Sequence, residues 1–305
     1  MRILRDPETV KPCVLVLGMF DGVHRGHQKL LMQGVELSEQ HHLPLVVCTF
    51  EPHPLRVLRP ECAPPLLTTL TERAQIMASF GVDCFCINTF SRKVAEVHYE
   101  EYLAELVRTY QPQHIVCGYN FTFGKGGEGN AEVLEACGLV YGYETHIVPE
   151  VVLDGAPVSS TRIRALLRQG DIHGANRLLG HAYSMAGKVV DGKHVGRTLG
   201  FPTANVDVPA GKALPAYGVY ACWLQDGDRS YPAVVNVGRH PTFPEGSVTV
   251  EANVLDANLQ LYGKKVRLQF LYFLRSEKKF ASPEMLQAQI ATDVQTCRDY
   301  FASIQ

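Results

Sequence analysis

The chain has 305 residues, enough for two hydrophobic cores, so a domain boundary is expected near its middle. Hydrophobic residues make up 46% of the chain, charged residues 20%, and the formal net charge is -2. These values are typical of globular proteins and exclude a general polyanion-binding surface. We therefore expect any phosphate binding to be local, and we expect no nucleic-acid partner.

The sequence has neither a membrane-spanning stretch nor a signal-peptide core. No segment approaches about eighteen consecutive apolar residues, and the apolar residues of 1–7 are interrupted by Arg2, Arg5 and Asp6. The cysteines form no C-x-x-C pair, and Cys13, Cys48, Cys86 and Cys117 lie in apolar runs, which is typical of reduced core residues. We expect a cytoplasmic protein without membrane association, and the oligomeric state is left open.

The N-terminal half alternates short apolar runs with longer segments that have apolar residues at helical spacing. The predicted strands are residues 13–20, 45–50, 82–87, 114–119 and 143–148. The predicted helices are residues 27–40, 71–80, 99–110 and 130–141. A βαβ series of this kind predicts a parallel sheet of Rossmann-like type with helices on both faces.

Beyond Gly180 the pattern changes to alternating segments separated by Gly and Pro. The predicted strands there are residues 217–224, 233–237, 248–255 and 266–274. They indicate an antiparallel domain, a small β-barrel. A last helix is expected to begin near Ser282, with Pro283 in its first turn and an apolar stripe that packs on the barrel. We place the boundary at residue 182, giving domains 1–182 and 183–305.

A glycine-rich turn, GMFDGVHRGH over residues 18–27, follows the first predicted strand. Unpaired N–H groups at a helix start favour phosphate, and parallel sheets bind ligands at the carboxyl ends of their strands. His24 and His27 are three residues apart, so both point the same way from the first helical turn and can stabilise a phosphate in the transition state. Each feature alone fits an ordinary turn, but their combination favours a nucleotide site.

A second anion site is indicated by SSTRIR over residues 159–164. Hydroxyl groups at a helix start bind anions, and the guanidinium of Arg164 can bind two phosphate oxygens. A capped helix with solvated arginines is the alternative. Paired with the first turn across a sheet, this segment is predicted to form the far wall of a triphosphate site.

Residues 124–129, GKGGEG, fit the dinucleotide-binding pattern G-x-G-x-x-G and precede a predicted helix. Residues 120–123 separate this run from the strand, and Glu144 comes too early to be the acid expected about 20 residues on. We therefore interpret this run as a mobile glycine-rich flap and not as a dinucleotide-binding site.

Together with FEPHP at 50–54 and GYNFTFG at 118–124, these segments resemble the adenylyltransferase module of the bacterial bifunctional riboflavin kinase/FAD synthetase family, which belongs to the H-x-G-H nucleotidyltransferases. The resemblance implies ATP at residues 18–27 with FMN beside it. It implies catalytic roles for His24, His27 and Arg164. The implied ATP contacts are Gly18, Phe20, Asp21, Gly22, His24, His27, Ser160, Thr161 and Arg164. The implied FMN contacts are His53, Asn120 and Phe123.

A second glycine-rich segment, GKVVDGKHVGRTLGFPTAN over residues 187–205, lacks the spacing of a P-loop. Its glycines permit close backbone approach to phosphate. Thr203 and Asn205, alternate residues of an extended chain, direct two neutral oxygens to one point, which suits a hydrated Mg²⁺. The spacing alone favours a hairpin with a polar face.

The same segment resembles the signature of riboflavin kinases, and later motifs such as YGVY at 217–220 and LYG at 261–263 match that module in order. The resemblance implies that Glu251 takes the proton from the ribityl 5'-hydroxyl and that Thr203 and Asn205 hold Mg²⁺. The implied nucleotide and flavin contacts are Gly187, Gly196, Arg197, Gly200, Phe201, Pro202, Thr203, Asn205 and Arg275. Met19 and Asn253 depart from the family pattern.

We therefore expect a bifunctional transferase of flavin cofactor synthesis. The barrel would phosphorylate riboflavin to FMN with ATP, and the N-terminal domain would adenylylate FMN to FAD with release of pyrophosphate, with Mg²⁺ at both sites. One alternative makes the β domain a passive module for RNA, which the lack of a basic run with interleaved aromatics disfavours. The other alternative is an NAD-binding oxidoreductase that uses residues 124–129.

Overall fold

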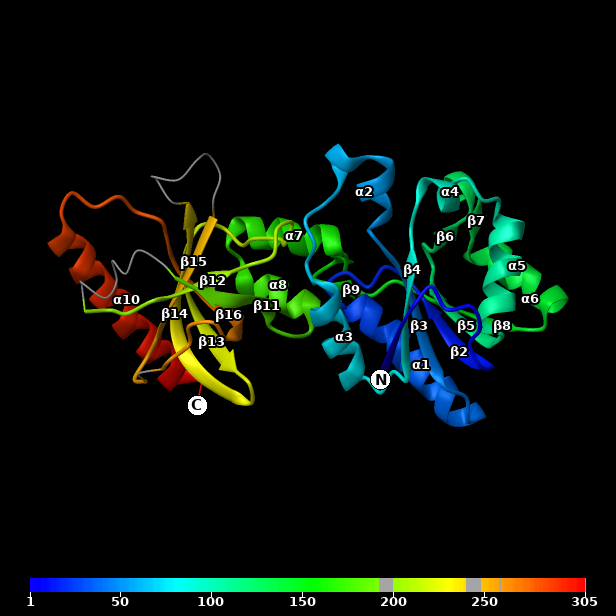
Figure 1. Ribbon diagram of the computed structural model, residues 1–305, viewed down its shortest axis with the longest axis horizontal. Coiled ribbons are helices and arrows are strands. Elements are labelled where there is room, and N and C mark those ends of the chain that lie inside the picture. The colour runs from blue at the N-terminus through cyan, green and yellow to red at the C-terminus, as the bar shows by residue number, and fades with distance from the viewer. Residues whose placement is uncertain (192–199, 240–247, 258, 305) are drawn as a thin grey trace. The chain divides into compact units, whose positions relative to one another are not determined.

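The computed structural model describes residues 1–191, 200–239, 248–257 and 259–304 (Figure 1). These residues form two compact units. The first comprises Met1–Pro65 and Thr69–Ser159, and the second comprises Leu66–Thr68 and Ser160–Gln305. Gly196 and Arg197, two predicted kinase residues, lie outside the described residues.

A six-stranded sheet with the order β1-β4-β3-β2-β5-β8 forms the centre of the first unit. Its strands are β1 (Arg2–Arg5), β2 (Cys13–Leu17), β3 (Leu45–Glu51), β4 (Cys84–Thr89), β5 (Pro112–Gly118) and β8 (Glu144–Val148). Every neighbouring pair is parallel, which confirms the predicted sheet. The additional strand β1 is short and mostly exposed, so it lacks the apolar run that marks the others.

Helices cover both faces of this sheet. On one face, α1 (Arg25–His41) and α3 (Leu70–Ser79) contribute Leu31 and Met77 to a core with Val14, Val16 and Val47. On the other face lie α5 (Tyr99–Tyr110) and α6 (Ala131–Tyr141). The short elements of this unit are α2 (Pro54–Leu58), η1 (Pro60–Cys62), α4 (Arg92–Ala95), β6 (Thr122–Phe123), η2 (Lys125–Gly127), β7 (Gly129–Asn130), β9 (Val152–Leu153) and β10 (Ala156–Pro157).

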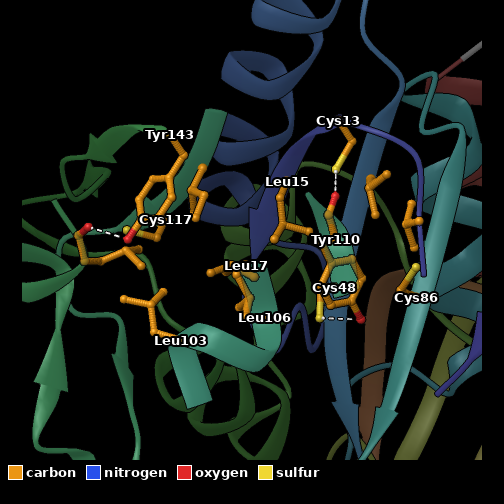
Figure 2. Packing of buried hydrophobic residues seen from close by; sticks show 14 of the residues in the cluster. Cys13, Leu15, Leu17, Cys48, Cys86, Leu103, Leu106, Tyr110, Cys117 and Tyr143 are labelled. Carbon is orange, nitrogen blue, oxygen red and sulfur yellow. Dashed lines mark hydrogen bonds between the residues drawn. The ribbon is translucent and has the colours of Figure 1, made fainter. Parts of the chain in front are cut away.

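The core under α5 and α6 contains several thiols (Figure 2). The thiol of Cys13 donates to the backbone carbonyl of Tyr110 at 3.2 Å, and that of Cys48 donates to the phenol oxygen of Tyr110 at 3.5 Å. Burial raises the pKa of Cys13 to about 12 and that of Cys48 to about 11, so both stay protonated. Together with Cys86 and Cys117 they are buried free thiols, as the sequence predicts.

The second unit is built on a closed antiparallel barrel with the order β11-β12-β15-β14-β13-β16. Its strands are β11 (Tyr183–Val190), β12 (Ala204–Asp207), β13 (Gly218–Asp226), β14 (Arg229–Arg239), β15 (Val248–Val254) and β16 (Lys265–Ser276). Side chains that alternate along each strand, among them Tyr220, Val235 and Phe270, are fully buried. The predicted barrel is thus confirmed, with β11 and β12 added to the four predicted strands.

Three helices complete the second unit. α7 (Ser160–Gln169) and α8 (Ile172–Leu179) precede the barrel, and α10 (Pro283–Ser303) follows it. The hydroxyl of Ser282 caps α10 by accepting from the N–H of Met285, as the Ser-Pro start predicts. α10 packs Val294, Cys297 and Phe301 against the outer face of the barrel. No helix in the described part of the chain is long and apolar enough to span a membrane.

Candidate active sites

The turn between β2 and α1 has an unusual backbone. Phe20, Gly22 and Val23 have φ angles of 54°, 85° and 41°. A positive φ is costly for a β-branched residue such as Val23, and such strain persists where surrounding contacts impose it, often at binding sites. Here the N–H of Val23 donates to the carbonyl of Phe20 at 3.1 Å, and both side chains are fully buried. These contacts therefore hold the backbone of the turn in one conformation.

His24 and His27 lie together at the start of α1. His24 is the N-cap residue, and its Nδ1 accepts from the N–H of His27 at 3.4 Å. Their rings stack with centroids 3.7 Å apart and an angle of 13° between the planes. A Cβ on Gly26 would lie 3.1 Å from the His24 ring, so a residue without a side chain suits this position. The structure thus confirms that both imidazoles project from one helical start.

Burial lowers the pKa of His27 well below its usual value, and the neighbouring charges of His24 and Arg73 lower it further. The ring is therefore neutral near pH 7. Its Nδ1 is buried and has no hydrogen-bond partner within the described ranges. Buried polar atoms without a partner are uncommon in folded proteins, and a functional role is one reason for them.

Arg73 is a buried cation beside this turn that the sequence analysis did not identify. It is 1% exposed, and its NH1 donates to the carbonyl of Met19 at 3.0 Å. Thr49 donates to the same carbonyl at 3.1 Å. Burial lowers the pKa of Arg73, while the charges of Asp21, Glu51 and Glu72 oppose that shift. The capping box of Thr69 and Glu72 marks the start of α3 in the sequence, but no local pattern reveals where Arg73 points.

The predicted far wall belongs to a segment that starts near the turn. Val158 is a member of the first unit, and its carbonyl oxygen would lie 3.9 Å from a Cβ on Gly26. Ser160 and Thr161 follow at the start of α7, which belongs to the second unit, as does the buried Arg164. Their place in a triphosphate site stays a prediction.

The predicted FMN contacts come from two loops of the first unit. His53 caps α2, because its Nδ1 accepts from the N–H of Leu55 at 3.2 Å. Asn120 is exposed just after β5. Phe123 is 6% exposed and packs against Tyr102, with ring centroids 5.6 Å apart. Phe123 therefore contributes to the core as well as to any flavin contact.

The glycine-rich run at 124–129 lies between β6 and β7, which form an antiparallel hairpin. It does not form the strand-to-helix turn of a dinucleotide fold. Glu128 accepts from the N–H of Tyr99 at 2.9 Å, and Lys125 pairs with Glu96 at 2.8 Å. The geometry agrees with a flap, and its mobility stays a prediction.

The strongest arrangement in the barrel is a row of paired residues on its outer face. Asn205 of β12 is directly opposite Glu251 of β15, which in turn is opposite Asn236 of β14. Directly opposed residues of antiparallel strands point to the same face, with Cβ atoms about 5 Å apart. Val250 and Ala252 on either side of Glu251 are buried, as expected for the inner face. Glu251 and Asn205 are therefore brought together.

Thr203 and Asn205 also line a cavity of about 170 Å³ in the second unit. Its other walls include Val189, Ala252 and Leu261. The side-chain amide of Asn253 donates to the carbonyl of Pro202 at 2.8 Å, which fixes the chain just before Thr203. Asn253, a departure from the family pattern, thus has a positioning contact of its own.

The remaining kinase candidates have mainly structural surroundings. A Cβ on Gly187 would lie 2.2 Å from the carbonyl oxygen of Asp207, so only glycine fits there. Gly200 has a φ of 87°, and Phe201 packs at the edge of the core under α10. Arg275 forms a two-pronged ion pair with Asp293 of α10, with Nε 2.8 Å and NH2 2.6 Å from the carboxylate oxygens. Its predicted contact with flavin or phosphate stays a prediction.

The first unit has a parallel sheet with a histidine-bearing turn at a helix start. The barrel of the second unit has a carboxylate beside polar side chains. Together these features indicate a two-domain transferase that acts on nucleotides. The FAD synthetase family model matches residues 6–162, and the riboflavin kinase family model matches residues 179–301.

Curated relatives match nearly the whole chain. The bifunctional riboflavin kinase/FMN adenylyltransferase of Escherichia coli (strain K12) is 36% identical over 95% of this chain and 93% of its own length. The Bacillus subtilis (strain 168) protein of that description is 33% identical over 96% of this chain and 93% of its own length. A solved structure, described as a macrolide-efflux protein from Streptococcus pneumoniae, has 32% identity, a TM-score of 0.88 and coverage of 98% of this chain and 99% of its own.

The chain belongs to the family of bifunctional riboflavin kinase/FMN adenylyltransferases. Its C-terminal domain is the riboflavin kinase and its N-terminal domain is the FAD synthetase, so one chain catalyses both steps from riboflavin to FAD. Riboflavin, FMN and ATP are its small-molecule substrates.

Proposed function

We propose that Glu251 is the general base of the kinase step. The observation that supports this most strongly is its position opposite Asn205, because a carboxylate beside a metal and phosphate ligand can reach the attacking hydroxyl. Glu251 would take the proton of the ribityl 5'-hydroxyl as that oxygen bonds to the γ-phosphorus of ATP, and ADP would leave.

Thr203 and Asn205 would hold Mg²⁺ and the phosphates in this domain. Both line one cavity, and Asn205 is directly opposite Glu251 in the sheet, so their neutral oxygens and that carboxylate would provide an all-oxygen donor set of the kind Mg²⁺ prefers. When bound, Mg²⁺ supplies positive charge that offsets the charge on the transferred phosphoryl group. Asn253 would position this segment through its bond to Pro202. Gly187, Gly196, Arg197, Gly200, Phe201 and Arg275 would complete the nucleotide and flavin contacts.

The FAD synthetase step would need no strong base, because the attacking FMN phosphate is already anionic. His24, His27 and the N–H groups at the start of α1 would align the α-phosphorus of ATP and stabilise the departing pyrophosphate. The unsatisfied Nδ1 of His27 supports this assignment. Gly18, Phe20, Asp21 and Gly22 would shape the ATP site, and Ser160, Thr161 and Arg164 would close it, with Mg²⁺ present here too.

We propose that His53, Asn120 and Phe123 contact FMN in this domain. We also propose a functional boundary at residue 182, between the two catalytic domains. The free state of the nine cysteines supports a cytoplasmic location, because reducing compartments keep thiols unpaired.

The test is to incubate the purified chain with riboflavin, ATP and Mg²⁺, and then with FMN, ATP and Mg²⁺, and to separate the flavins by chromatography. The proposal expects FMN and FAD from the first mixture and FAD from the second. It also expects both products to disappear when EDTA replaces Mg²⁺. Full turnover in EDTA would disprove the role of Mg²⁺. In a variant with one residue replaced, loss of only the kinase step or only the FAD synthetase step would assign that residue to the domain that catalyses the lost step.

A further inference from the structure

Three side chains with metal-binding atoms come together where β5 and β8 begin. β8 is the edge strand of the sheet, and its parallel pairing with β5 sets His114 opposite Glu144 and Val116 opposite His146. Because alternate residues of a strand share a face, His114, Glu144 and His146 point to the same side of the sheet.

The distances between their ligand atoms suit one small cation. Nδ1 of His114 lies 3.2 Å from Nε2 of His146 and 3.5 Å from Oε2 of Glu144. Nε2 of His146 lies 3.8 Å from Oε1 of Glu144. Tetrahedral ligands at the usual zinc distances are separated by about 3.3 to 3.6 Å. The three groups therefore need only small side-chain shifts to share a metal ion.

We propose that His114, Glu144 and His146 bind a divalent transition-metal ion of the Zn²⁺ class, with water in a fourth position. Two imidazoles and one carboxylate are a known donor set for zinc with an open position, and imidazole favours such metals over Mg²⁺. The side chain of His114 is 8% exposed, whereas that of Glu144 is 66% exposed. The cluster is therefore buried on the side of His114 and accessible to solvent on the side of Glu144.

The cluster of His114, Glu144 and His146 is separate from the turn between β2 and α1. The ring of His41, in the last turn of α1, lies against His114 with centroids 4.1 Å apart. His24 caps the opposite end of the same helix, and 17 helical residues span about 25 Å. A metal ion here would therefore take no part in phosphate chemistry. It would tie the edge strand β8 to β5 at the end of the sheet opposite the nucleotide turn.

The competing explanation is a metal-free hydrogen bond between the two imidazoles, since 3.2 Å is also a hydrogen-bond distance. The two explanations differ in a measurable way. A hydrogen-bonded pair has no specific affinity for Zn²⁺, whereas a metal site loses affinity when either an imidazole or the carboxylate is changed.

The experiment is a Zn²⁺ titration of the chelator-treated full chain, carried out in a Cys62→Ser background because Cys62 is an exposed thiol. We expect one tight site. His146→Ala and Glu144→Gln should each weaken it at least about tenfold, since even outer groups around metal sites have effects of that size. His24→Ala is the matched control, because His24 and His27 are another histidine pair, and it should keep the affinity.

Two further readouts keep the result independent of folding defects. Co²⁺ should give the strong visible absorption of a four-coordinate site in the parent and lose it in Glu144→Gln, a same-shaped change at an exposed position. Zn²⁺ should raise the Tm of the parent and not that of Glu144→Gln. Equal Zn²⁺ affinity in the parent and both cluster variants, or loss of the site in His24→Ala, would overturn the proposal.

Discussion

His24 and His27 stack face to face, with ring centroids 3.7 Å apart, and the Nδ1 of His24 accepts from the N–H of His27. Two protonated imidazoles repel each other at this distance, so the pair cannot easily carry two charges by itself. A polyphosphate bound at the start of α1 supplies the negative charge that removes this conflict. We therefore expect the pair to gain charge if ATP binds at this helix start, as proposed.

Replacing His27 with Ala should lower the rate of FAD formation from FMN by about 10² to 10³, the usual cost of removing one donor that stabilises a transition state. FMN formation from riboflavin should be unchanged, because His27 belongs to the first unit. The measurement is kcat for each half-reaction by flavin chromatography. His173→Ala, at an exposed position of α8, is the control and should keep both rates. Equal losses in both half-reactions would contradict the assignment.

Replacing Glu251 with Gln should have the opposite selectivity. Removing a general base typically lowers the rate by about 10² to 10⁴, so FMN formation should nearly stop. FAD formation from supplied FMN should continue at the parental rate. Glu284→Gln, an exposed carboxylate at the start of α10, controls for the loss of one negative charge. If Glu251→Gln phosphorylates riboflavin at the parental rate, another group must accept the proton.

The sequence predicts features that depend on neighbours along the chain. The βαβ alternation, the histidine pair at one helix start and the Ser-Pro cap of α10 follow from local spacing, and the structure confirms them. α1 begins at Arg25, so His24 is a cap and not a residue within the helix. Local spacing therefore locates the turn between β2 and α1 but misses the exact helix boundary.

The features that the sequence does not predict depend on contacts between distant segments. Arg73 reaches the carbonyl of Met19 across 54 positions, and nothing near Arg73 signals that partner. The pairing of Asn205 with Glu251 requires the register of two barrel strands, and β12 is too short to show a pattern. The cluster of His114 and His146 likewise depends on the parallel register of β5 and β8.

Replacing Asp293 with Asn should destabilise the barrel by about 3 to 5 kcal/mol. Asp293 is 5% exposed and forms a two-pronged pair with Arg275, whose side chain is 16% exposed, so the change leaves a largely buried guanidinium without its counter-charge. The free energy of unfolding of the full chain, measured in urea, checks this. Asp256→Asn is the matched control, because Asp256 pairs with Arg298 at an exposed position and should change stability little. Similar losses of unfolding free energy in the two variants would show that the buried position of the Arg275–Asp293 pair does not increase its contribution to stability.

The last prediction concerns acid stability. Burial keeps the pKa of His27 well below about 6.5, its value in the unfolded chain, so the unfolded state binds the proton first as the pH falls. The stability contributed by neutral His27 is therefore complete above about pH 6.5 and is lost below it, with a slope of at most about 1.4 kcal/mol per pH unit. His27→Gln should show a shallower decline between pH 7 and pH 5 in urea unfolding. His114, whose pKa burial also lowers, adds a decline of the same sign to both proteins and cancels in the comparison. Identical pH profiles for the two proteins would mean that His27 is not held neutral in the folded chain.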